Sequence, residues 1–353
     1  MKILNKIQLA LIFLAMACFI GVITSLIVNS LITNQFIFEA QERVKEDLNT
    51  ARWVYTSKIR DIDRTIHWTS PRHVLKNALK EKNITLIRDE LSAFMKEEGL
   101  DFLTLVDQKG TVIFRFHNPH LSGDSLIEDP FIKLALEKKR ISGTQVLSGE
   151  ELLKEGEPLA RRATLQLIPT RKAKPTPKIE ETSGMVLKSA DPVIDSKGEV
   201  LGALTEGVLL NRNYEIVDRI KNIIFKDARY KGKEIGTATI FLGNLRISTN
   251  VMDKEGKRAI GTRAMEEVGE QVLEKGMPWI QRAFVVGDWY ITAYEPIRNI
   301  QSKIVGILYV GILENKYSLI KERLILLFFL FSMSGMLIAL TVSFLLSWKM
   351  IKK

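Results

Sequence analysis

Two long apolar segments without charge stand near the two ends of the chain. Residues 7–32 and 324–348 contain no Asp, Glu, Lys or Arg. As helices with a rise of about 1.5 Å per residue they would be about 37–39 Å long, more than the ~30 Å hydrocarbon core of a bilayer. A cleaved signal peptide is the alternative for the first segment, but its apolar run exceeds the usual ~7–15 residues and Ala15-Met16-Ala17 is a weak cleavage signal. The pattern therefore predicts two transmembrane helices.

A helical period follows the first apolar segment. In residues 33–70, apolar or small side chains recur mostly three or four positions apart, with charged residues between them. The recurring positions are Ile37, Val44, Leu48, Ala51, Tyr55, Ile59, Ile62 and Ile66. This spacing predicts one long helix that continues out of the membrane and carries an apolar stripe along one face. Such a stripe can pack against its own domain, against a second subunit, or against both.

Two shorter helices and then a β period come next. Ser70-Pro71 is typical of a helix start, and Gly99 is expected to end a helix over residues 85–98. From Asp101 onward apolar residues alternate in short runs, which predicts strands. The expected elements are a hairpin over 101–116, a helix capped by Asp129-Pro130 and running to about Lys139, strands over 144–147 and 163–168, and a hairpin over 183–210. The proline-rich segment Pro169–Thr182 predicts an exposed insertion in a loop.

An internal repeat organises the region between the apolar segments. Ser189–Leu210 and Ala293–Glu314 share an acidic residue followed by proline, and then two glycines, at the same offsets. The matched positions are Asp191-Pro192 and Glu295-Pro296, Gly202 and Gly306, and Gly207 and Gly311. Three such landmarks predict a duplicated α/β module. In the second copy strands are expected over 237–242, 245–250, 279–286, 289–296 and 304–313, with helices over 213–225 and 264–274, so that each copy forms a five- or six-stranded antiparallel sheet.

Charge predicts how the chain lies in the membrane. Lysines without any acidic residue stand at both ends, at positions 2, 6, 349, 352 and 353. The positive-inside bias therefore places both ends in the cytoplasm and residues 33–323 outside. The predicted organisation is a cytoplasmic N-terminus (1–6), a first span (7–32), a long signalling helix (33–70), a membrane-distal module (71–211), a membrane-proximal module (212–314), a second span (324–348) and a cytoplasmic end (349–353).

The remaining composition excludes several functions. Half of the net charge of +10 comes from the five lysines at the ends, so the rest of the chain is only mildly basic, and it shows no interleaving of arginine with aromatic residues; no nucleic acid is therefore expected as a partner. The single cysteine, Cys18, lies inside the first span, which leaves no disulfide and no thiolate metal site outside the membrane.

Several motifs resemble those of a known family. They are GTATIFLGNLRISTNV (236–251), RAIGTR (258–263), VVGDWYITAYEPI (285–297), VGILYVGILE (305–314) and LLNRNYEIVDRI (209–220). With two tandem modules between two spans, the chain resembles the double Cache sensor region, of the fused Cache_3–Cache_2 type, of bacterial sensor histidine kinases and methyl-accepting chemotaxis receptors. The resemblance covers about residues 35–320 and is specific in the second half. It implies an α+β fold of two tandem PAS-like Cache modules with antiparallel sheets, led by a long N-terminal helix and flanked by two transmembrane helices.

The same resemblance frames the expected function. Such receptors continue after the second span into a HAMP domain and a kinase, methyl-accepting or cyclase module, whereas this chain stops at Lys353. It is therefore either the sensory portion of a longer protein, which could be a histidine kinase, or a natural stub that acts on a separate kinase. The chain as given has no nucleotide-binding motif, so we expect no enzymatic activity. The alternative is a membrane-anchored extracytoplasmic binding or scaffold protein without its own output.

Metal-ligand and catalytic residue types are present without a matching pattern. His117-Asn118-Pro119-His120, with Asp124 and Glu128, offers imidazoles and carboxylates, but a proline-containing turn does not fix ligand geometry. A solvated loop is the favoured interpretation, and no cofactor or metal is expected. No Ser/His/Asp order, paired-carboxylate cleft or HExxH helix marks an anchored hydrolase.

Polar and aromatic residues on the predicted strands are the candidates for binding a small-molecule ligand. In the distal module these are Arg115, His117 and Lys188; in the proximal module they are Arg282, Tyr290 and Tyr294. A guanidinium beside aromatic walls suits a carboxylate, such as an organic acid or an amino acid. The alternative is that the tyrosines fill a core and the cations lie on the surface. The sequence thus predicts a membrane sensor and homodimer in which the last strand passes a ligand-induced shift to the second span.

Overall fold

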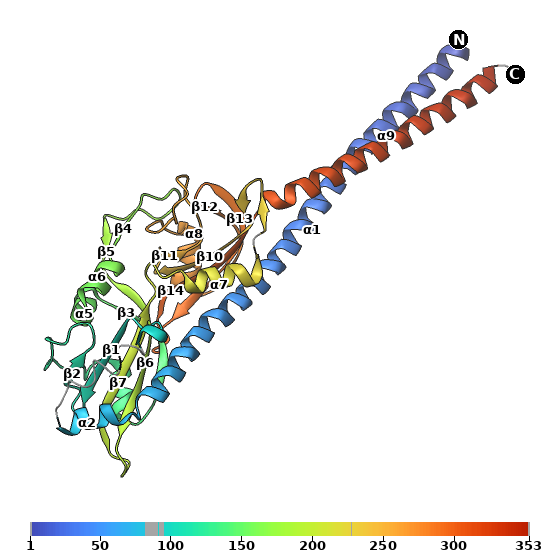
Figure 1. Cartoon of the computed structure of the whole chain (residues 1–353). Helices are drawn as coiled ribbons and strands as arrows, with labels where there is room; N and C mark the ends of the chain where they lie inside the picture. Colours follow the sequence, from blue (N-terminus) through green and yellow to red (C-terminus); the bar gives the residue numbers. More distant parts are fainter. Residues whose placement is uncertain (1, 82–90, 92–94, 227, 352–353) are drawn as a thin grey trace. The chain divides into compact units, whose positions relative to one another are not determined.

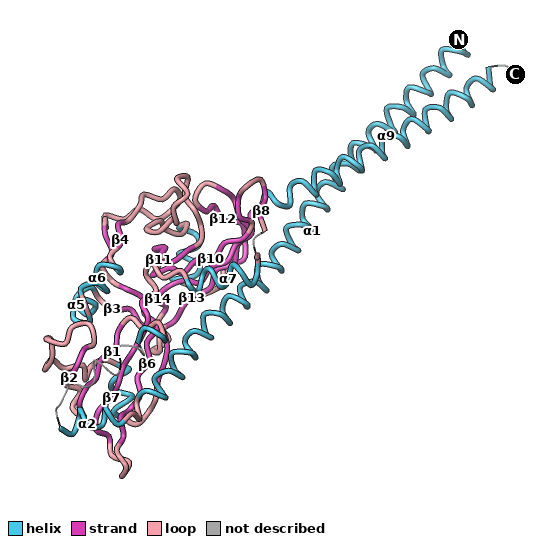
Figure 2. Tube along the Cα trace, viewed as in Figure 1, coloured by secondary structure: helices cyan, strands magenta, loops and turns pink. Residues whose placement is uncertain are grey.

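The computed structural model describes residues 2–81, 91, 95–226 and 228–351 (Figures 1 and 2). It confirms the predicted α+β fold with a long N-terminal helix, two sheets and two apolar helices at the ends. The chain divides into two compact units, one made of residues 1–43 with 313–353 and the other of Val44–Ile312.

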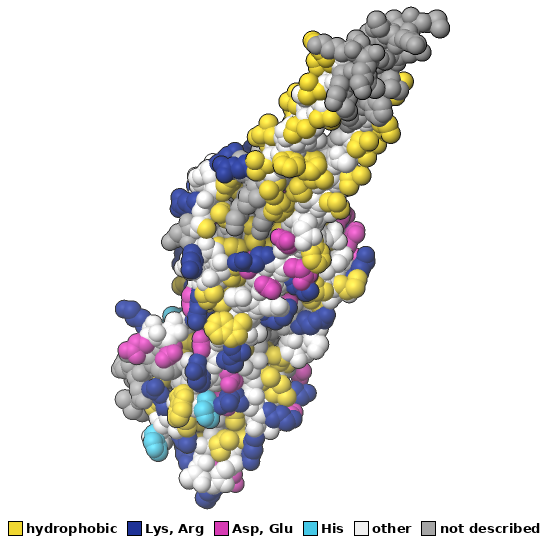
Figure 3. Space-filling model, turned by 90° about the vertical axis from the view of Figure 1, so that its right-hand side faces the viewer, with side chains coloured by type: hydrophobic (Ala, Val, Ile, Leu, Met, Phe, Trp, Pro, Cys, Tyr) yellow, Lys and Arg dark blue, Asp and Glu magenta, His cyan; other side chains and the backbone are white. Residues whose placement is uncertain are grey.

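The first unit is helical. It contains the first part of α1 (Lys2–Thr69) and all of α9 (Asn315–Ile351). Two described segments, Phe19–Thr69 and Arg323–Val342, are long and apolar enough to cross a membrane. A Cβ added at Gly21 would lie 3.7 Å from the Ser332 hydroxyl, so the two helices run side by side here. Hydrophobic side chains gather on the surface of both helices (Figure 3), as expected of helices that meet lipid rather than water.

The second unit holds two five-stranded antiparallel sheets of matching strand order, which confirms the predicted duplication. The first sheet has the order β2-β1-β7-β6-β3 and the second has the order β11-β10-β14-β13-β12; the parts of the chain that hold them are called the first and the second module. The strands of the first sheet are β1 (Phe102–Asp107), β2 (Val112–Arg115), β3 (Ile141–Leu147), β6 (Gly184–Ile194) and β7 (Val200–Leu209). Those of the second are β10 (Gly236–Leu242), β11 (Leu245–Thr249), β12 (Trp279–Val285), β13 (Asp288–Arg298) and β14 (Ile304–Leu313).

The matched glycines recur because the strands leave no room for a side chain. A Cβ at Gly202 would lie 2.1 Å from the Val106 carbonyl oxygen, and one at Gly306 would lie 2.0 Å from the Phe241 carbonyl oxygen. Gly202 and Gly306 occupy the same position in the two sheets, each on the central strand beside the first strand of its module. The repeat in sequence is therefore a repeat of one close strand contact.

Short helices and ribbons complete the unit. They are α2 (His73–Glu81), α4 (Pro130–Leu136), α5 (Gly149–Glu155), α6 (Glu157–Ala163), α7 (Glu215–Ile224), α8 (Glu266–Gly269) with a following π turn (Glu270–Glu274), and the ribbons β4 (Leu165–Gln166) with β5 (Glu180–Glu181) and β8 (Arg229–Tyr230) with β9 (Lys233–Glu234). Asp129 caps α4 as predicted, since its carboxylate accepts the backbone N–H groups of Phe131 and Ile132.

Two local predictions need correction. α2 begins at His73 rather than at Ser70-Pro71, because the Ser70 hydroxyl donates to the buried Asp191 carboxylate instead of capping a helix. The strand expected over 163–168 is reduced to Leu165–Gln166, since the preceding residues form α6. Most of the helix predicted over 85–98 lies outside the described residues.

The predicted stripe of α1 packs against its own unit. Six of its positions are at most 5% exposed, namely Val44, Leu48, Ala51, Tyr55, Ile62 and Ile66. Polar contacts reinforce this packing on both modules: the Tyr55 hydroxyl lies 2.7 Å from Thr144 Oγ1, and Arg52 Nε donates to Glu295 at 2.9 Å. These six positions are therefore unavailable to a second subunit, whereas Ile59 is half-buried, Ile37 is exposed, and the outward side of α1 exposes Trp53 and Trp68.

The two modules also interlock through the turn between β13 and β14. Ile300 of this turn packs against the core of the first module, which contains Phe131. A Cβ added at Gly143 of β3 would lie 2.6 Å from the Ile300 side chain, and Asn299 forms an isolated bridge with Thr144. The tip of the repeated hairpin thus reaches from one module into the other.

Candidate ligand-binding sites

The first module has a cavity of about 290 Å³ that contains two of the predicted cations, Arg115 and Lys188. Arg115 is 1% exposed and Lys188 is 4% exposed. The Arg115 guanidinium binds Asp124 with two hydrogen bonds of 2.7 and 2.9 Å and donates to Glu155 Oε1 at 3.2 Å. Lys188 Nζ lies 2.6 Å from the Asp129 carboxylate. Both cations therefore already have carboxylate partners within the module.

The two cations lower the pKa values of the Asp124 and Asp129 carboxylates beside them. The hydrogen bond from Arg115 lowers the pKa of Asp124, although partial burial acts in the opposite direction. Burial alone would raise the pKa of Asp129, but the charge of Lys188 and hydrogen bonds from Lys188 and two backbone amides lower it. The two buried cations are consequently paired with carboxylates before any ligand enters. His117 is exposed and lies outside the set of residues that lines the cavity.

In the second module the predicted cation and the predicted tyrosines lie on opposite faces of the sheet. Tyr290 pairs with Ala283, whereas Arg282 pairs with Ile291, the residue that follows Tyr290 on β13. Directly paired residues share a face and neighbours along a strand alternate, so Arg282 points away from both Tyr290 and Tyr294. Arg282 is exposed, with its guanidinium 4.0 Å from the centre of the Trp289 ring.

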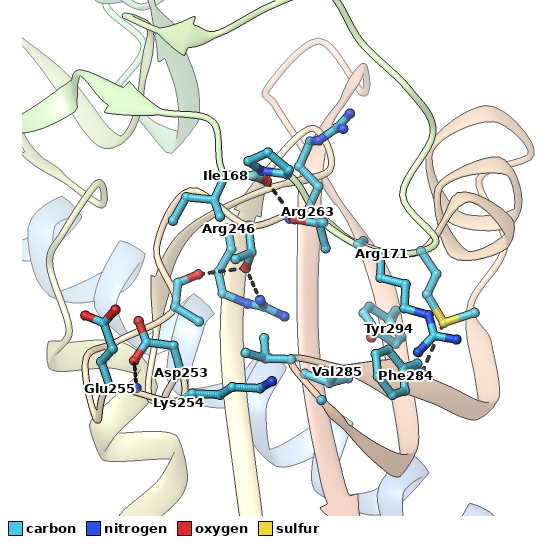
Figure 4. Close-up of a pocket in the computed structure, with 18 residues that line it drawn as sticks. Ile168, Arg171, Arg246, Asp253, Lys254, Glu255, Arg263, Phe284, Val285 and Tyr294 are labelled. Carbon is cyan, nitrogen blue, oxygen red and sulfur yellow. Dashed lines mark hydrogen bonds between the residues drawn. The ribbon is translucent and has the colours of Figure 1, made fainter.

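Tyr294 lines a cavity of about 340 Å³ in the second module (Figure 4). The buried cation in this cavity is Arg246, a residue outside the predicted set. Arg246 lies on β11 opposite Phe241 and is 2% exposed. Its guanidinium is 5.1 Å from the centre of the Phe241 ring and donates to the Thr262 hydroxyl.

Arg246 differs from Arg115 in its counter-charge. Its Nε has no hydrogen-bond acceptor, and none of the ion pairs found in the described part of the chain includes Arg246. Burial lowers the pKa of Arg246, but a guanidinium still stays protonated in a protein. Burial of such a cation costs desolvation free energy, and no ion pair with a neighbouring carboxylate that the structure describes offsets this cost.

The neighbouring tyrosines do not supply that charge. Tyr294 and Tyr309 stack with ring centres 4.5 Å apart, and Tyr309 shares a 2.8 Å hydrogen bond with Thr237. Burial raises the pKa of Tyr290 to about 12 and that of Tyr294 and Tyr309 further. All three hydroxyls are therefore neutral at physiological pH, and of the three tyrosines Tyr294 contributes to the wall of the cavity.

One side of this cavity is built by the first module. The segment Ile168–Lys174, which we call the strap, consists of the last residue of the strand predicted over 163–168 and the first part of the predicted exposed insertion Pro169–Thr182. Its anchors are hydrogen bonds from Ile168 N to Gly261 O (2.8 Å), from Glu266 N to Lys172 O (2.8 Å), from Arg263 N to Thr170 Oγ1 (3.0 Å) and from Arg263 Nη1 to Lys174 O (2.7 Å). A Cβ at Gly261 would lie 2.3 Å from the Gln166 carbonyl oxygen, so this approach requires glycine. The insertion is exposed in its side chains, as predicted, but its docking on the second module was not foreseen.

The cavity around Arg246 has the composition of a small-molecule site. Its volume falls in the range of ~300–1,000 Å³ typical of ligand pockets. Thr262 and Tyr294 add hydroxyls, and Ala259, Ala264 and Val285 add apolar wall. Within the described ranges, no group of three or more His, Cys, Asp or Glu residues is placed to hold a metal ion. The arrangement suits a small organic anion; the ligand-binding roles predicted for Arg115, His117, Lys188, Arg282, Tyr290 and Tyr294 stay predictions.

Comparison with known proteins gives a family match for part of the chain and several similar solved structures. Residues 208–323 match the family described as single cache domain 3. Similar solved structures include the periplasmic domain of Vibrio cholerae LuxQ (13% identity, 76% of this chain and 98% of that chain, TM-score 0.43). The sensor domain of the V. cholerae histidine kinase DctB (12%, 80% and 98%, TM-score 0.42) is another. A third is the ligand-binding domain of the Pseudomonas aeruginosa PAO1 amino acid chemoreceptor PctB in complex with L-Arg (14%, 80% and 97%, TM-score 0.37). No match to the sequence was found among curated proteins.

Proposed function

Residues 208–323 are a Cache domain of the single cache domain 3 family, and from this premise we propose that the chain is the ligand-sensing part of a bacterial membrane receptor. The proposed receptor is of the histidine kinase or chemoreceptor type. Its output comes from a cytoplasmic module, either in the same polypeptide or in a separate kinase.

The proposed location is the cytoplasmic membrane, with α1 and α9 as the two spans and residues 33–323 outside. Two observations support it. Both helices contain segments long and apolar enough to cross a bilayer. Lysines without acidic residues flank these segments at both ends of the chain, which is the pattern of cytoplasmic ends.

The proposed ligand is a small organic anion held by Arg246, and the unbalanced charge of this buried guanidinium is the observation that carries the proposal. A carboxylate can accept two parallel hydrogen bonds from a guanidinium, and such charge-assisted bonds are strong in a water-poor site. Ligand binding would thus supply the counter-charge that the second module lacks around Arg246. The buried cations of the first module need no such counter-charge, because Asp124 and Glu155 already pair with Arg115, and Asp129 pairs with Lys188.

The proposed route of the signal starts at the same residues. Arg246 stacks on Phe241, which contacts Tyr294 and Tyr309 with ring centres 6.3 Å away in each case. Tyr309 lies on β14, which ends at Leu313, and α9 begins at Asn315. A ligand that binds one arrangement of these rings more tightly than another would shift the equilibrium of β14 and hence of α9.

The receptor is proposed to act as a homodimer. Because six of the eight stripe positions of α1 are buried within their own unit, the outward side of this helix with Trp53 and Trp68 is the surface we assign to the second subunit. Disulfide cross-linking of single cysteines at position 53 in membranes is expected to give dimers. Cysteines at position 48, where Leu48 is buried, are expected to give none.

The ligand proposal is tested by thermal unfolding of the detergent-solubilised chain with a panel of small carboxylates, their amides and the corresponding amines. We expect at least one carboxylate to stabilise the protein, by about 2.7 kcal/mol at a concentration of 100 Kd, and its amide to have no effect. Arg246→Gln is expected to abolish this stabilisation, while Arg282→Gln, an exposed arginine of the same module, retains it. Stabilisation by amines alone, or by a carboxylate equally in Arg246→Gln, would refute the proposal.

A further inference from the structure

The strap places a second arginine at the cavity of Arg246. Arg171 lines the same cavity, with its guanidinium 5.6 Å from the centre of the Phe284 ring. Figure 4 shows Arg171 reaching over Phe284, while Arg246 and Lys254 extend toward the middle of the labelled side chains and Arg263 extends away from them. None of the ion pairs found in the described ranges includes Arg171 or Arg246.

The acidic residues at the rim are engaged elsewhere. Asp253 Oδ1 accepts the backbone N–H groups of Glu255 and Lys257, each at 2.9 Å, and thereby closes its own turn. The Glu255 carboxylate lies 3.0 Å from Lys257 Nζ. Of the four lining cations, Arg171, Arg246 and Lys254 lie at the cavity and Arg263 extends away from it, against the two acids Asp253 and Glu255, so the cavity has an excess of one positive charge.

The strap is held on the second module mainly by backbone hydrogen bonds. Three of its four anchoring hydrogen bonds use a backbone carbonyl or amide of the strap and one uses a hydroxyl, whereas the side chains of Ile168, Arg171 and Lys172 are exposed. Little apolar surface therefore holds it in place, which is the character of segments that open locally. Lys172 rests on the neighbouring ring of Trp289 at 4.6 Å, outside the set of residues that lines the cavity.

We propose that the strap is the lid of the Arg246 site and that Arg171 selects ligands with two anionic groups, one bound by Arg246 and the other by Arg171. This inference rests on the proposed function, since it requires an anion on Arg246. The ligand class is a small organic dianion whose two anionic groups are separated by a short apolar chain that contacts Val285. Because the strap belongs to the first module, its closure over a ligand in the second module couples ligand binding to the first module.

The test is isothermal titration calorimetry of the full chain in nanodiscs with the α,ω-dicarboxylates from malonate to adipate and with the half-amide of each. The half-amide keeps the length of the diacid but has one charge. We expect one diacid to bind about 10- to 100-fold more tightly than its half-amide, the gain typical of one further charge-assisted hydrogen-bonded pair. Arg171→Gln is expected to reduce diacid affinity to that of the half-amide and to leave half-amide affinity unchanged. Lys172→Gln, on the same strap, is the matched control and is expected to change neither.

A second readout follows the strap itself. The bonds after Arg171 and Lys172 are trypsin sites, and the diacid is expected to slow cleavage there at least several-fold, whereas the half-amide at equal saturation leaves the rate unchanged. Equal affinities of Arg171→Gln and the wild type for the diacid would overturn the inference, as would an equal loss of diacid and half-amide binding. If Arg246→Gln then still abolishes half-amide binding, the proposed function stands alone. If no carboxylate binding depends on Arg246, both fail.

Discussion

Replacement of Arg246 by methionine is expected to leave the ligand-free protein as stable as the wild type or more stable, whereas the same replacement at Arg115 destabilises it. Both arginines are almost fully buried, at 2% and 1% exposure. They differ in their partners, because Arg115 neutralises Asp124 and Glu155 while Arg246 has the Thr262 hydroxyl and the Phe241 ring. Methionine keeps a long apolar side chain at each position and removes the charge together with the contacts of the guanidinium.

The magnitudes follow from these contacts. Removal of Arg246 relieves a desolvation penalty of several kcal/mol. It forfeits a charged hydrogen bond of about 1.5–3 kcal/mol and a ring contact of about 2 kcal/mol, so the net change lies between about 0 and 2 kcal/mol in favour of methionine. Removal of Arg115 leaves Asp124 and Glu155 without their partner. Breaking a buried pair in this way costs about 3–5 kcal/mol, and we expect about 3 kcal/mol because the Asp124 side chain is 27% exposed.

The assay is thermal and urea unfolding of the full chain in detergent, followed by the fluorescence of its five tryptophans. At about 2–4 °C per kcal/mol, Arg115→Met is expected to lower Tm by about 6–12 °C and Arg246→Met to raise it by up to about 8 °C. Arg282→Met is the control and is expected to change stability by less than about 1 kcal/mol, because Arg282 is exposed. A loss of 3 kcal/mol or more in Arg246→Met would show that Arg246 is a structural cation, and the reasoning about its missing counter-charge would be wrong.

Three further substitutions test other parts of the structure. Burial, with Glu98 and Asp191 nearby, raises the pKa of Glu206 well above its ordinary value, and both carboxylate oxygens lack hydrogen-bond partners. The stability that the protonated Glu206 carboxyl provides is present below pH 4.5 and is lost as pH rises toward its folded-state pKa. Glu206→Gln is therefore expected to raise Tm at pH 7 and to leave Tm unchanged at pH 4. The dependence of Tm on pH between these values is expected to become flatter. Gly306→Ala is expected to destabilise by at least about 1–3 kcal/mol in urea unfolding because its Cβ meets the Phe241 carbonyl, whereas the control Gly269→Ala, in open space on a helix, is neutral or stabilising. Ile300→Ala is expected to lower the free energy of unfolding by about 1–2 kcal/mol through lost packing on the first module, and the exposed neighbour Gln301→Ala to leave it unchanged.

The fold was predictable wherever the cause is local. The repeated glycines mark one strand contact in two copies, and the period of α1 is visible in a single stretch of sequence. The repeat also explains its acidic residue before proline. Asp191 accepts a hydrogen bond from Ser70 just after α1, and Glu295 accepts one from Arg52 within α1. Both landmarks therefore tie a sheet to the same part of the chain.

The site was less predictable because its properties are not local. Arg246 alternates with Leu245 and Ile247 on β11, so period-two alternation assigns it to a solvent-facing side of the strand. Tyr294 and the strap, both distant in sequence, turn that side into an interior. A usable signal is the pairing of Arg246 with Phe241 across the predicted hairpin, since a large aromatic residue beside a cation argues against a fully solvated face.

Long-range partners also decide the charge of the predicted cations. Arg115 and Lys188 were identified as cations on a sheet, and the structure buries both of them. Their carboxylates come from a loop and from helix termini, namely Asp124, Glu155 and Asp129, and no spacing rule links these to the strands. Arg282, an exposed member of the predicted set, lies on the face opposite the tyrosines because the register of β12 and β13 determines the faces.

The central claim is that an anionic ligand binds at Arg246, and the most direct measurement is the position of a bound carboxylate. Crystals of the full chain with 3-bromopropionate, recorded at the bromine absorption edge, locate the ligand by its anomalous signal. The account predicts a bromine peak inside the cavity lined by Arg246, Tyr294 and Val285. A peak confined to the first-module cavity of Arg115 and Lys188 would contradict it.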